Sequence, residues 1–513
     1  MNSLLASEYI ARRGSGWPRS SRPLQFYRSL SLLVVLGGGA CTHAPLPRID
    51  GAPAAPPSSS EPWRAPRGTV PREPAPHVGP TALLPPDVAA RSQGLLLSDV
   101  VDVALRNNPQ TQLSWAQARA GADAYGAASA SYIPTVDASA NAAYSQTAIG
   151  QTLGGVGTRR SITPAVSLSY LLFDFGGRSG TVSAARSAAM ALDLTHNATL
   201  QDVALQVEAA YFNYQALRNL AVATRLTLAE ADTNLASARQ RNQAGVATIA
   251  DVLQAETLRA QAELDLETAE GNFQIGRGAL ATAMGLQASA PYALAPVSDS
   301  VPVALVAADV DTLIDRALEN RPDLAAARVQ ILQAQAEVRV ARSTELPSLS
   351  LGSTYTHPYS SQRNATGYNF GVTLGVAIPL FNLARPYNVM AARAQVDAST
   401  ARASLLRTEV AQQVYTSYYT LQTATQRART ADVLLVSASR SEVAARARYR
   451  GGVGTILDLI TAQTALASAR AQQAQSRWIW STALAQLAHD VGVLGPRGES
   501  PIPLSTDSTR IRR

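Results

Sequence analysis

The chain has 513 residues, enough for two or three ordinary domains. Only 6% of the residues are aromatic, and the many Ala, Gln, Arg, Leu and Glu residues favour long, closely packed helices over a wide globular core. The net charge of +7 comes from Arg interspersed with Asp and Glu, which is typical of solvated helix faces and argues against nucleic-acid binding. The single Cys excludes an intramolecular disulfide framework and a zinc site built from several thiolates.

Residues 1–40 are predicted to be a signal peptide for export. Several Arg residues precede a short apolar run from Leu30 to Leu36, and small residues follow as far as Ala40. The run is too short for a bilayer, which takes about 20 residues, and the order basic, apolar, small is that of a secretory signal. Two alternatives remain open for the next residue: lipidation of Cys41, as in bacterial lipoproteins, or ordinary cleavage after Ala40.

Residues 41–93 are predicted to be a tether. They are rich in Pro, Ala and Ser, a composition that forms neither regular helix nor sheet and therefore stays extended. At the other end of the chain, residues 496–513 are assigned to a C-terminal tail.

The sequence between the tether and the tail consists of two repeats of one unit, at 94–300 and 301–495. The clearest matching pair is Gly245–Val252 (GVATIADV) and Gly452–Leu459 (GVGTILDL). The other pairs are Ala104–Pro109 with Ala317–Pro322, Tyr132–Pro134 with Glu345–Pro347, Leu172–Phe175 with Leu380–Leu383, and Tyr211–Phe212 with Tyr418–Tyr419. All pairs keep the same order, and their offset drifts only from 213 (322 against 109) to 207 (459 against 252) residues. These ordered matches indicate an internal duplication.

Each repeat contains two segments of strict two-residue alternation, which predicts β-strands. In the first repeat these are 135–144 and 166–172, with a loop at Gly150–Gly157 between them. In the second repeat they are 349–355 and 368–380. One face of each strand is apolar, and a length of about 10 residues suits a tilted transmembrane strand.

The remaining segments of both repeats are predicted to be helical. Residues 178–243 and 386–450 have no internal Pro, and a helix of about 65 residues would be about 100 Å long. Shorter helices are expected at 110–132, 248–285, 323–345 and 455–491. Two short helices laid end to end match one long helix, so each repeat can be one long helix packed against two short ones. The strand pair then lies at one end and the Gly-Val turn at the other.

Four strands per chain cannot close a barrel, which takes about eight, and lipid does not tolerate open sheet edges. The chain is therefore expected to form oligomers, and three copies would supply twelve strands. The predicted fold class is an α plus β membrane barrel. It combines the duplicated helix–strand–strand–helix repeat, a long periplasmic α-helical barrel and four transmembrane β-strands per chain.

These features resemble the TolC-type outer-membrane efflux family over about residues 94–495. The most specific parts are the doubled architecture, the turn Tyr449–Leu459 (YRGGVGTILDL) and the strand-to-helix junction Leu172–Arg178 (LFDFGGR). The matching junction Phe381–Arg385 lacks the two Gly of the family pattern. The resemblance implies a homotrimeric, non-enzymatic channel without cofactor in the cell outer membrane, spanning into the periplasm. It would carry substrates outward from an inner-membrane pump through a periplasmic adaptor (membrane fusion) protein.

The resemblance also places the two Gly-Val turns at the periplasmic tip. The positions that map onto the family's adaptor-contacting turns are Val246, Ala247, Thr248, Val453, Gly454 and Thr455. The first turn departs from the family pattern by having Ala247 in place of Gly. The tip is also where the family closes its pore with rings of acidic residues.

The local candidates for such a pore gate are Asp251 and Asp458. The Arg residues that flank the turns would be salt-bridge partners in a closed state: Arg241, Arg446, Arg448 and Arg450. A second interpretation of equal weight is helix capping. A carboxylate in the first turn of a helix interacts favourably with the helix dipole by about 0.3–1 kcal/mol, and the Thr residues that precede both Asp suit N-cap positions.

Other classes of protein fit the sequence less well. An enzyme is not expected, because His196, His357 and His489 are isolated, without the spacing of a metal site. A periplasmic adaptor would carry one helical hairpin between β-rich halves, and a structural coiled-coil protein of the envelope would show sustained Leu and Ile heptads. The duplicated repeat with its two strand pairs argues against both.

Overall fold

The computed structural model describes residues 94–149, 155–295, 308–360 and 367–494, together with four two-residue strands outside these ranges. The chain divides into two units, Met1–Gly79 and Pro80–Arg513. In the first unit the structure describes only the antiparallel pair β1 (Arg48–Ile49) and β2 (Ala52–Pro53). The predicted signal peptide and Cys41 lie outside the described residues.

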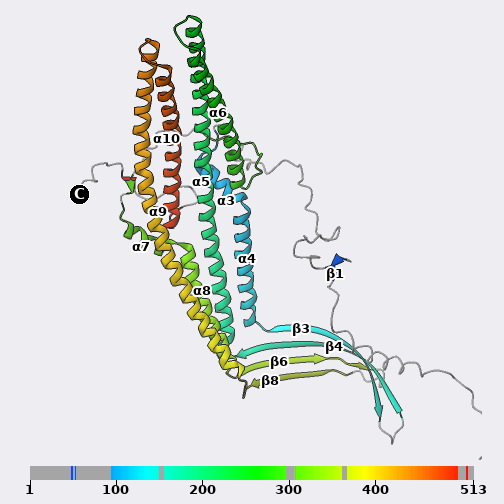
Figure 1. Ribbon diagram of the computed structural model, residues 1–513. Coiled ribbons are helices and arrows are strands. Elements are labelled where there is room, and N and C mark those ends of the chain that lie inside the picture. Colours follow the sequence, from blue (N-terminus) through cyan, green and yellow to red (C-terminus); the bar gives the residue numbers. More distant parts are fainter. Residues whose placement is uncertain are drawn as a thin grey trace, which may run out of the picture. The chain divides into compact units, whose positions relative to one another are not determined.

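The second unit contains the long helices that the sequence predicts (Figure 1). Helices α5 (Gly177–Gln243) and α9 (Ala384–Arg450) have 67 residues each. The four shorter helices are α4 (Pro109–Ser129), α6 (Ile249–Ala283), α8 (Pro322–Ser343) and α10 (Ile456–Asp490). Among the described helices, none is both long and apolar enough to cross a membrane.

The helices form an ordered row. Helix α5 packs against α4 and α6 of its own repeat and against α8 and α10 of the other repeat, whereas α9 packs against α8 and α10. The order is therefore α4 and α6, then α5, then α8 and α10, then α9. The row ends with α4 and α6 on one side and with α9 on the other.

Two further helices, α3 (Leu97–Asn107) and α7 (Val310–Asn320), precede α4 and α8. The sequence predicts helix in these segments but sets no bounds for them. The chain is extended at Asn108 and Arg321, directly before a Pro that begins the next helix. A residue before Pro is disfavoured in helical conformation, whereas Pro at the first helical position loses no hydrogen bond. The Asn108 side chain caps α4 by accepting a hydrogen bond from the Gln110 N–H at 2.8 Å.

The main hydrophobic core lies where α3 packs on α5 and α7 packs on α9. Its fully buried members come from both repeats and include Val100, Val203, Leu313, Val410 and Leu487. Buried Ala residues lie beside them, and their small side chains let the helix backbones approach closely. A short strand pair, β5 (Leu305–Val306) with β9 (Leu504–Ser505), joins the linker between the repeats to the C-terminal segment.

The strands form an antiparallel sheet in the order β3–β4–β6–β8. Their bounds are β3 (Thr135–Ile149), β4 (Gly155–Phe173), β6 (Ser348–Thr356) and β8 (Asn369–Ala377), and β7 (Tyr359–Ser360) adds a short pairing with β4. Strands β3 and β8 are the two edges. The two repeats meet in the middle of the sheet, where β4 pairs with β6.

The strand bounds differ from the sequence expectation at several points. With 15 and 19 residues, β3 and β4 are longer than the expected 10 or so. Gly155–Gly157, predicted to lie in a loop, begin β4 and pair with β3. Strand β8 ends at Ala377, three residues before the predicted end, because Pro379 lies within the predicted segment and has no N–H for a ladder hydrogen bond.

The sheet has one apolar face that no other described element covers. On β8 the alternating side chains Phe370, Val372, Leu374 and Val376 are 61–65% exposed. The residues between them, such as Gly371 and Thr373, are small or polar. An exposed apolar strand face of this size needs an apolar environment.

Candidate functional site

The candidate site is the pair of turns that join α5 to α6 and α9 to α10, at the ends of the two long helices farthest from the sheet (Figure 1). Each turn begins with a Gly in left-handed conformation, Gly245 with φ of 73° and Gly452 with φ of 75°. The next residue, Val246 or Val453, donates its backbone N–H to a carbonyl five residues back at 3.0 Å. This is the Schellman ending of a helix, which requires a residue tolerant of positive φ.

Both turns expose apolar side chains. Val246 is 66% exposed and Val453 is 73% exposed, and Ile249 and Leu457 at the start of the following helices are exposed as well. Ala247 and Gly454 are half-buried, and Thr248 and Thr455 are exposed. At Gly454 a Cβ would lie 3.0 Å from the Cβ of Arg448, so this turn is more tightly closed than the first.

The two candidate gate carboxylates act as helix caps in this structure. Asp251 accepts a hydrogen bond from the Thr248 backbone N–H at 2.8 Å, and its own N–H donates to the Thr248 hydroxyl at 3.3 Å. Asp458 and Thr455 repeat this reciprocal pair at 3.1 and 3.2 Å. These are capping boxes. Hydrogen bonds from the Thr455 backbone and hydroxyl lower the pKa of Asp458, so it is charged at neutral pH.

Arg241 joins the two hairpins. Its Nη1 donates a hydrogen bond to the backbone carbonyl of Tyr449 at 2.8 Å, and its guanidinium carbon lies 4.7 Å from the centroid of the Tyr449 ring. The partners of Arg241 are thus a carbonyl and a ring face in place of a carboxylate. Burial raises the pKa of Tyr449. Arg450, another flanking candidate, is exposed at the end of α9.

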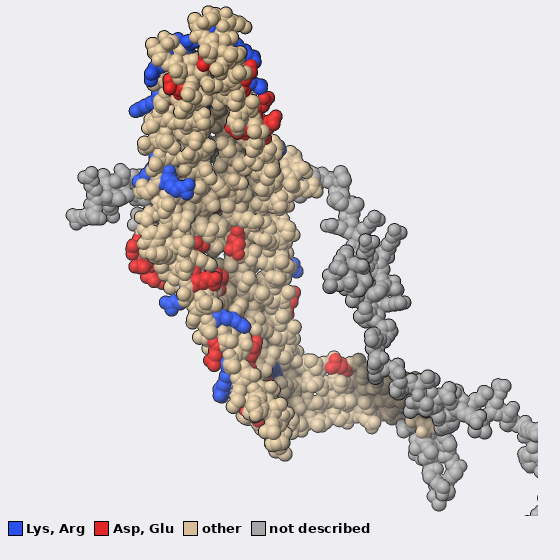
Figure 2. Space-filling view, in the orientation of Figure 1, with Lys and Arg blue, Asp and Glu red and all other residues tan. Residues whose placement is uncertain are grey.

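A charged network lies behind the turns and includes Arg446, one of the Arg residues expected to form salt bridges. Glu230 on α5 lies 3.8 Å from Arg446 of α9 and 3.5 Å from Arg470 of α10, and Arg446 also pairs with the buried Glu442 at 2.6 Å. Nothing in the local sequence marks Glu230 and Arg470 as members of the network, because they come from two other helices. Figure 2 shows acidic and basic side chains gathered side by side at this end of the helices.

The described residues contain no group of three or more His, Cys, Asp or Glu side chains arranged to hold a metal ion. The turns instead combine exposed apolar side chains with fixed charges. That combination suits contact with another protein.

Comparison with known proteins agrees with the duplicated architecture. The profile of the family described as outer membrane efflux protein matches residues 100–286 and 313–493, one stretch in each repeat. Protein CyaE of Bordetella pertussis is 30% identical over 398 residues, which is 75% of this chain and 81% of CyaE. The cobalt-zinc-cadmium resistance protein CzcC of Cupriavidus metallidurans is 28% identical over 328 residues, 61% of this chain and 73% of CzcC.

Solved structures show the same fold. The crystal structure of the Campylobacter jejuni CmeC outer membrane channel matches with a TM-score of 0.66 at 20% identity, covering 77% of this chain and 85% of CmeC. The family profile covers more than half of the chain, and CyaE is similar over most of its length. The chain therefore belongs to the outer membrane efflux protein family, whose members are transport channels of the outer membrane and not enzymes.

Proposed function

We propose that three copies of this chain form a closed duct across the outer membrane and into the periplasm. Strand β3 of one copy would pair with β8 of the next, giving twelve strands, and α9 of one copy would lie beside α4 and α6 of the next. The observation that carries this proposal is that the sheet and the helix row end at the same two edges. Edge strand β3 follows α4 along the chain, and edge strand β8 leads into α9. The same rotation from one copy to the next would therefore bring together both the edges of the sheet and the edges of the helix row.

The exposed apolar face of the sheet supports the membrane assignment. In a closed barrel the Phe370–Val376 row would face lipid, and the small and polar residues between them would face the lumen. Pairing of β3 with β8 would also satisfy backbone groups that an open edge leaves without partners in lipid.

The tip turns are the proposed contact with a periplasmic adaptor protein, which links the duct to an inner-membrane pump. Support comes from the exposed side chains of Val246 and Val453, held by rigid Schellman turns at corresponding places in the two hairpins. The adaptor-contact set remains Val246, Ala247, Thr248, Val453, Gly454 and Thr455. The pump is proposed to select the cargo, since relatives named for pyoverdine export and for cobalt-zinc-cadmium resistance share this architecture.

Two finer assignments accompany this proposal. Asp251 and Asp458 would narrow the closed pore, with Arg241 and Arg450 as its basic residues, while the same Asp side chains cap α6 and α10. Cys41, following the signal peptide, would be the lipidated first residue of the mature chain, joined to the first repeat by the tether 41–93.

Conductance of the purified protein in planar lipid bilayers tests the function. We expect trimers by native mass spectrometry and a small conductance for the wild type. Soluble monomers without conductance would overturn the proposal. Asp251→Asn/Asp458→Asn keeps an oxygen that can cap the helix but removes the charge, whereas the Ala double variant removes both. If the charges close the pore, both double variants conduct more than wild type. If only Ala raises conductance, the carboxylates are caps alone.

A further inference from the structure

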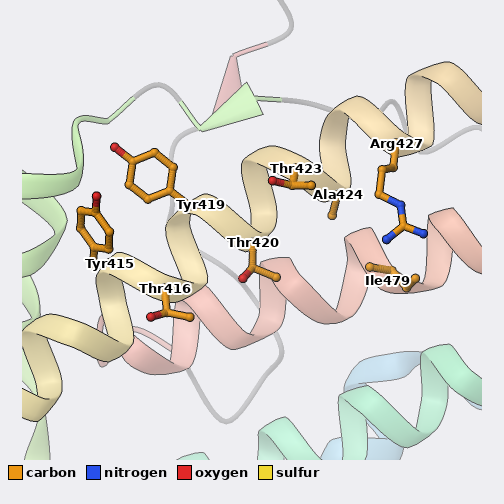
Figure 3. A pocket seen from close by; sticks show the side chains of 8 residues that line it. All are labelled: Tyr415, Thr416, Tyr419, Thr420, Thr423, Ala424, Arg427 and Ile479. Carbon is orange, nitrogen blue, oxygen red and sulfur yellow. The ribbon is translucent and has the colours of Figure 1, made fainter.

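An open pocket of about 470 Å³ lies along α9 (Figure 3). Its wall is formed by Thr416, Thr420, Thr423 and Arg427 of α9, with Tyr415 and Tyr419 beside them and Ile479 of α10 below. Tyr415 is 53% exposed. The contacts proposed for the tip turns do not involve this pocket.

The internal duplication shows what covers the corresponding surface in the other repeat. Helices α5 and α9 have equal length, and α9 begins 207 residues after α5 (384 against 177). Helices α6 and α10 also have equal length and the same offset (456 against 249). Residue 208 thus corresponds to residue 415. Glu208 is only 4% exposed, in contrast to Tyr415. Helix α5 has α8 and α10 of the other repeat beside it, whereas among the described elements the equivalent helices α4 and α6 do not pack on α9.

Three contacts fix how α10 lies on α5. Asn234 donates to Gln463 at 2.7 Å, Glu230 lies 3.5 Å from Arg470, and His489 lies 2.8 Å from Asp202. The helices are antiparallel, so residue numbers rise on α5 as they fall on α10.

The same contacts can be transferred to α9 and α6 through the offset of 207 residues. Asn234–Gln463 becomes Ser441–Glu256, Glu230–Arg470 becomes Ser437–Glu263, and Asp202–His489 becomes Glu409–Thr282. Each transferred pair combines a hydroxyl with a carboxylate, so each can form a hydrogen bond. Neither member of any pair is fully buried in the single chain.

The transferred pairs cannot form within one chain, because α6 and α9 lie at opposite ends of the helix row. They can form between two copies. Residues separated by multiples of seven lie on the same face of packed helices. Thr416 and Thr423 follow Glu409 at 7 and 14 residues, and Arg427 and Thr420 precede Ser441 at 14 and 21 residues. The pocket therefore lies on the same two residue rows as the transferred contacts.

The facing segment of α6 is complementary to the pocket. Interpolation between the transferred contacts places Ile275 level with Tyr419 and Thr420, and Glu270 level with Arg427. Ile275 is 72% exposed in the single chain, although it corresponds to Thr482, whose hydroxyl oxygen is buried. Glu270 already pairs with Arg225 at 2.5 Å, and its side chain remains 48% exposed.

We propose that this pocket on α9 is the seat of α6 from a second copy of the chain, in the register of the α5–α10 contact. Ile275 of the second copy enters beside Thr420, and Glu270 pairs with Arg427. The inference rests on the proposed trimer and adds to it the residues and the register that hold the helical barrel together.

Disulfide cross-linking tests the register. We expect Ser441→Cys/Glu256→Cys and Thr420→Cys/Ile275→Cys to give covalent dimers and trimers on mild oxidation. Ser441→Cys/Glu270→Cys should give little product, because Glu270 lies two heptads along α6 from Glu256, about 21 Å, beyond the separation of about 7 Å that a disulfide tolerates. Asn234→Cys/Gln463→Cys, the equivalent pair within one chain, should form an internal bond without covalent oligomers. Single-Cys variants control for the native Cys41.

The outcomes separate the two proposals. Monomers by native mass spectrometry would overturn the trimer itself. Trimers in which the shifted pair cross-links as well as or better than the matched pairs would overturn only the register. A charge exchange gives a second readout: Glu270→Arg and Arg427→Glu should each lower the fraction of trimer at low protein concentration, and the double variant should restore it. A double variant no better than either single change contradicts the pairing.

Discussion

Arg241 and Tyr449, 208 residues apart in the sequence, hold the two hairpins of each chain together at the tip through one hydrogen bond and one cation–π contact. The hydrogen bond uses the Tyr449 carbonyl near the end of α9, where helix carbonyls lack partners within the helix. A cation at that position also interacts favourably with the helix dipole. The contact is therefore suited to hold the hairpins at a fixed separation.

Arg241→Ala should loosen the tip and increase single-channel conductance, because both contacts to Tyr449 are lost. Arg241→Lys keeps the charge and one donor and should lie between wild type and Ala. Arg186→Ala, an exposed Arg on the same helix near the sheet, is the matched control and should behave as wild type. Equal conductance in Arg241→Ala and wild type would show that this contact does not restrict the pore.

His489 should make the fold more stable below neutral pH than above it. Burial lowers its pKa, but hydrogen bonds to Asp202 at 2.8 Å and to Asp490 at 3.1 Å raise it more, giving a pKa of about 9. Because the folded pKa is raised, the stabilisation is complete below about pH 6.5 and is lost as pH rises through 9. The contribution is on the order of 2–3 kcal/mol.

Thermal unfolding of the detergent-solubilised protein between pH 6 and 10 measures this effect. The wild type should lose stability over that window, and His489→Gln should be less stable at pH 6 with a flatter pH dependence. Parallel pH curves for the two proteins would contradict the assignment.

Glu208 should destabilise the fold at and above neutral pH. It is 4% exposed, its Oε1 has no hydrogen-bond partner, and burial raises its pKa to about 7. Folding therefore favours the protonated form, so stability is complete below about pH 4.5 and falls as pH rises through 7. Glu208→Gln keeps the shape without the charge and should raise the free energy of unfolding at pH 8 by on the order of 2 kcal/mol.

The control for Glu208 is Glu267→Gln, which removes an exposed carboxylate from α6. Chemical unfolding at pH 5 and pH 8 compares the variants. If Glu208→Gln stabilises equally at both pH values, or no more than Glu267→Gln, ionisation of Glu208 is not the cause.

Gly285 and Gly245 have the same backbone conformation but different surroundings. Their φ values are 72° and 73°, yet a Cβ at Gly285 would lie 2.6 Å from the backbone of Asn107, whereas one at Gly245 would meet nothing within 4 Å. Gly245→Ala should cost about 1–2 kcal/mol of left-handed strain. Gly285→Ala should lower the melting temperature further, because α3 must also move. Equal losses would mean that the contact of Gly285 with Asn107 is readily relaxed.

The sequence predicted the helices well because their ends carry local signals. Gly245 and Gly452 end the long helices, and Thr248 with Asp251 and Thr455 with Asp458 begin the next ones, as confirmed by the Schellman turns and capping boxes. The starts of α4 and α8 at Pro109 and Pro322 lie one residue from the expected starts at 110 and 323, whereas the sequence set no bounds for α3 and α7. A repeated Asn-Pro or Arg-Pro at the same place in both repeats was the available signal.

The sequence indicates only some of the contacts around the candidate site. The repeated Gly-Val motif predicts the turn residues. It does not predict the partner of Arg241, because nothing in the sequence around Tyr449 indicates a contact with α5. Glu442 and Arg446 are four residues apart on α9, but their proximity to Glu230 of α5 and Arg470 of α10 depends on three helices meeting at one level.

By itself the sequence determined the elements of this protein. Hydrophobic periodicity distinguished helices from strands, and Gly, Pro and Thr residues marked their ends. The internal duplication showed that each main element occurs once in each repeat. Only the tertiary structure decided which faces meet, such as α5 against α10, β4 against β6 and Arg241 against Tyr449. The physical reason is that turns and caps depend on hydrogen bonds within a few residues, whereas the register between helices depends on side chains packed across the whole chain. The same register, carried through the offset of 207 residues, is what assigns the pocket on α9 to a neighbouring copy.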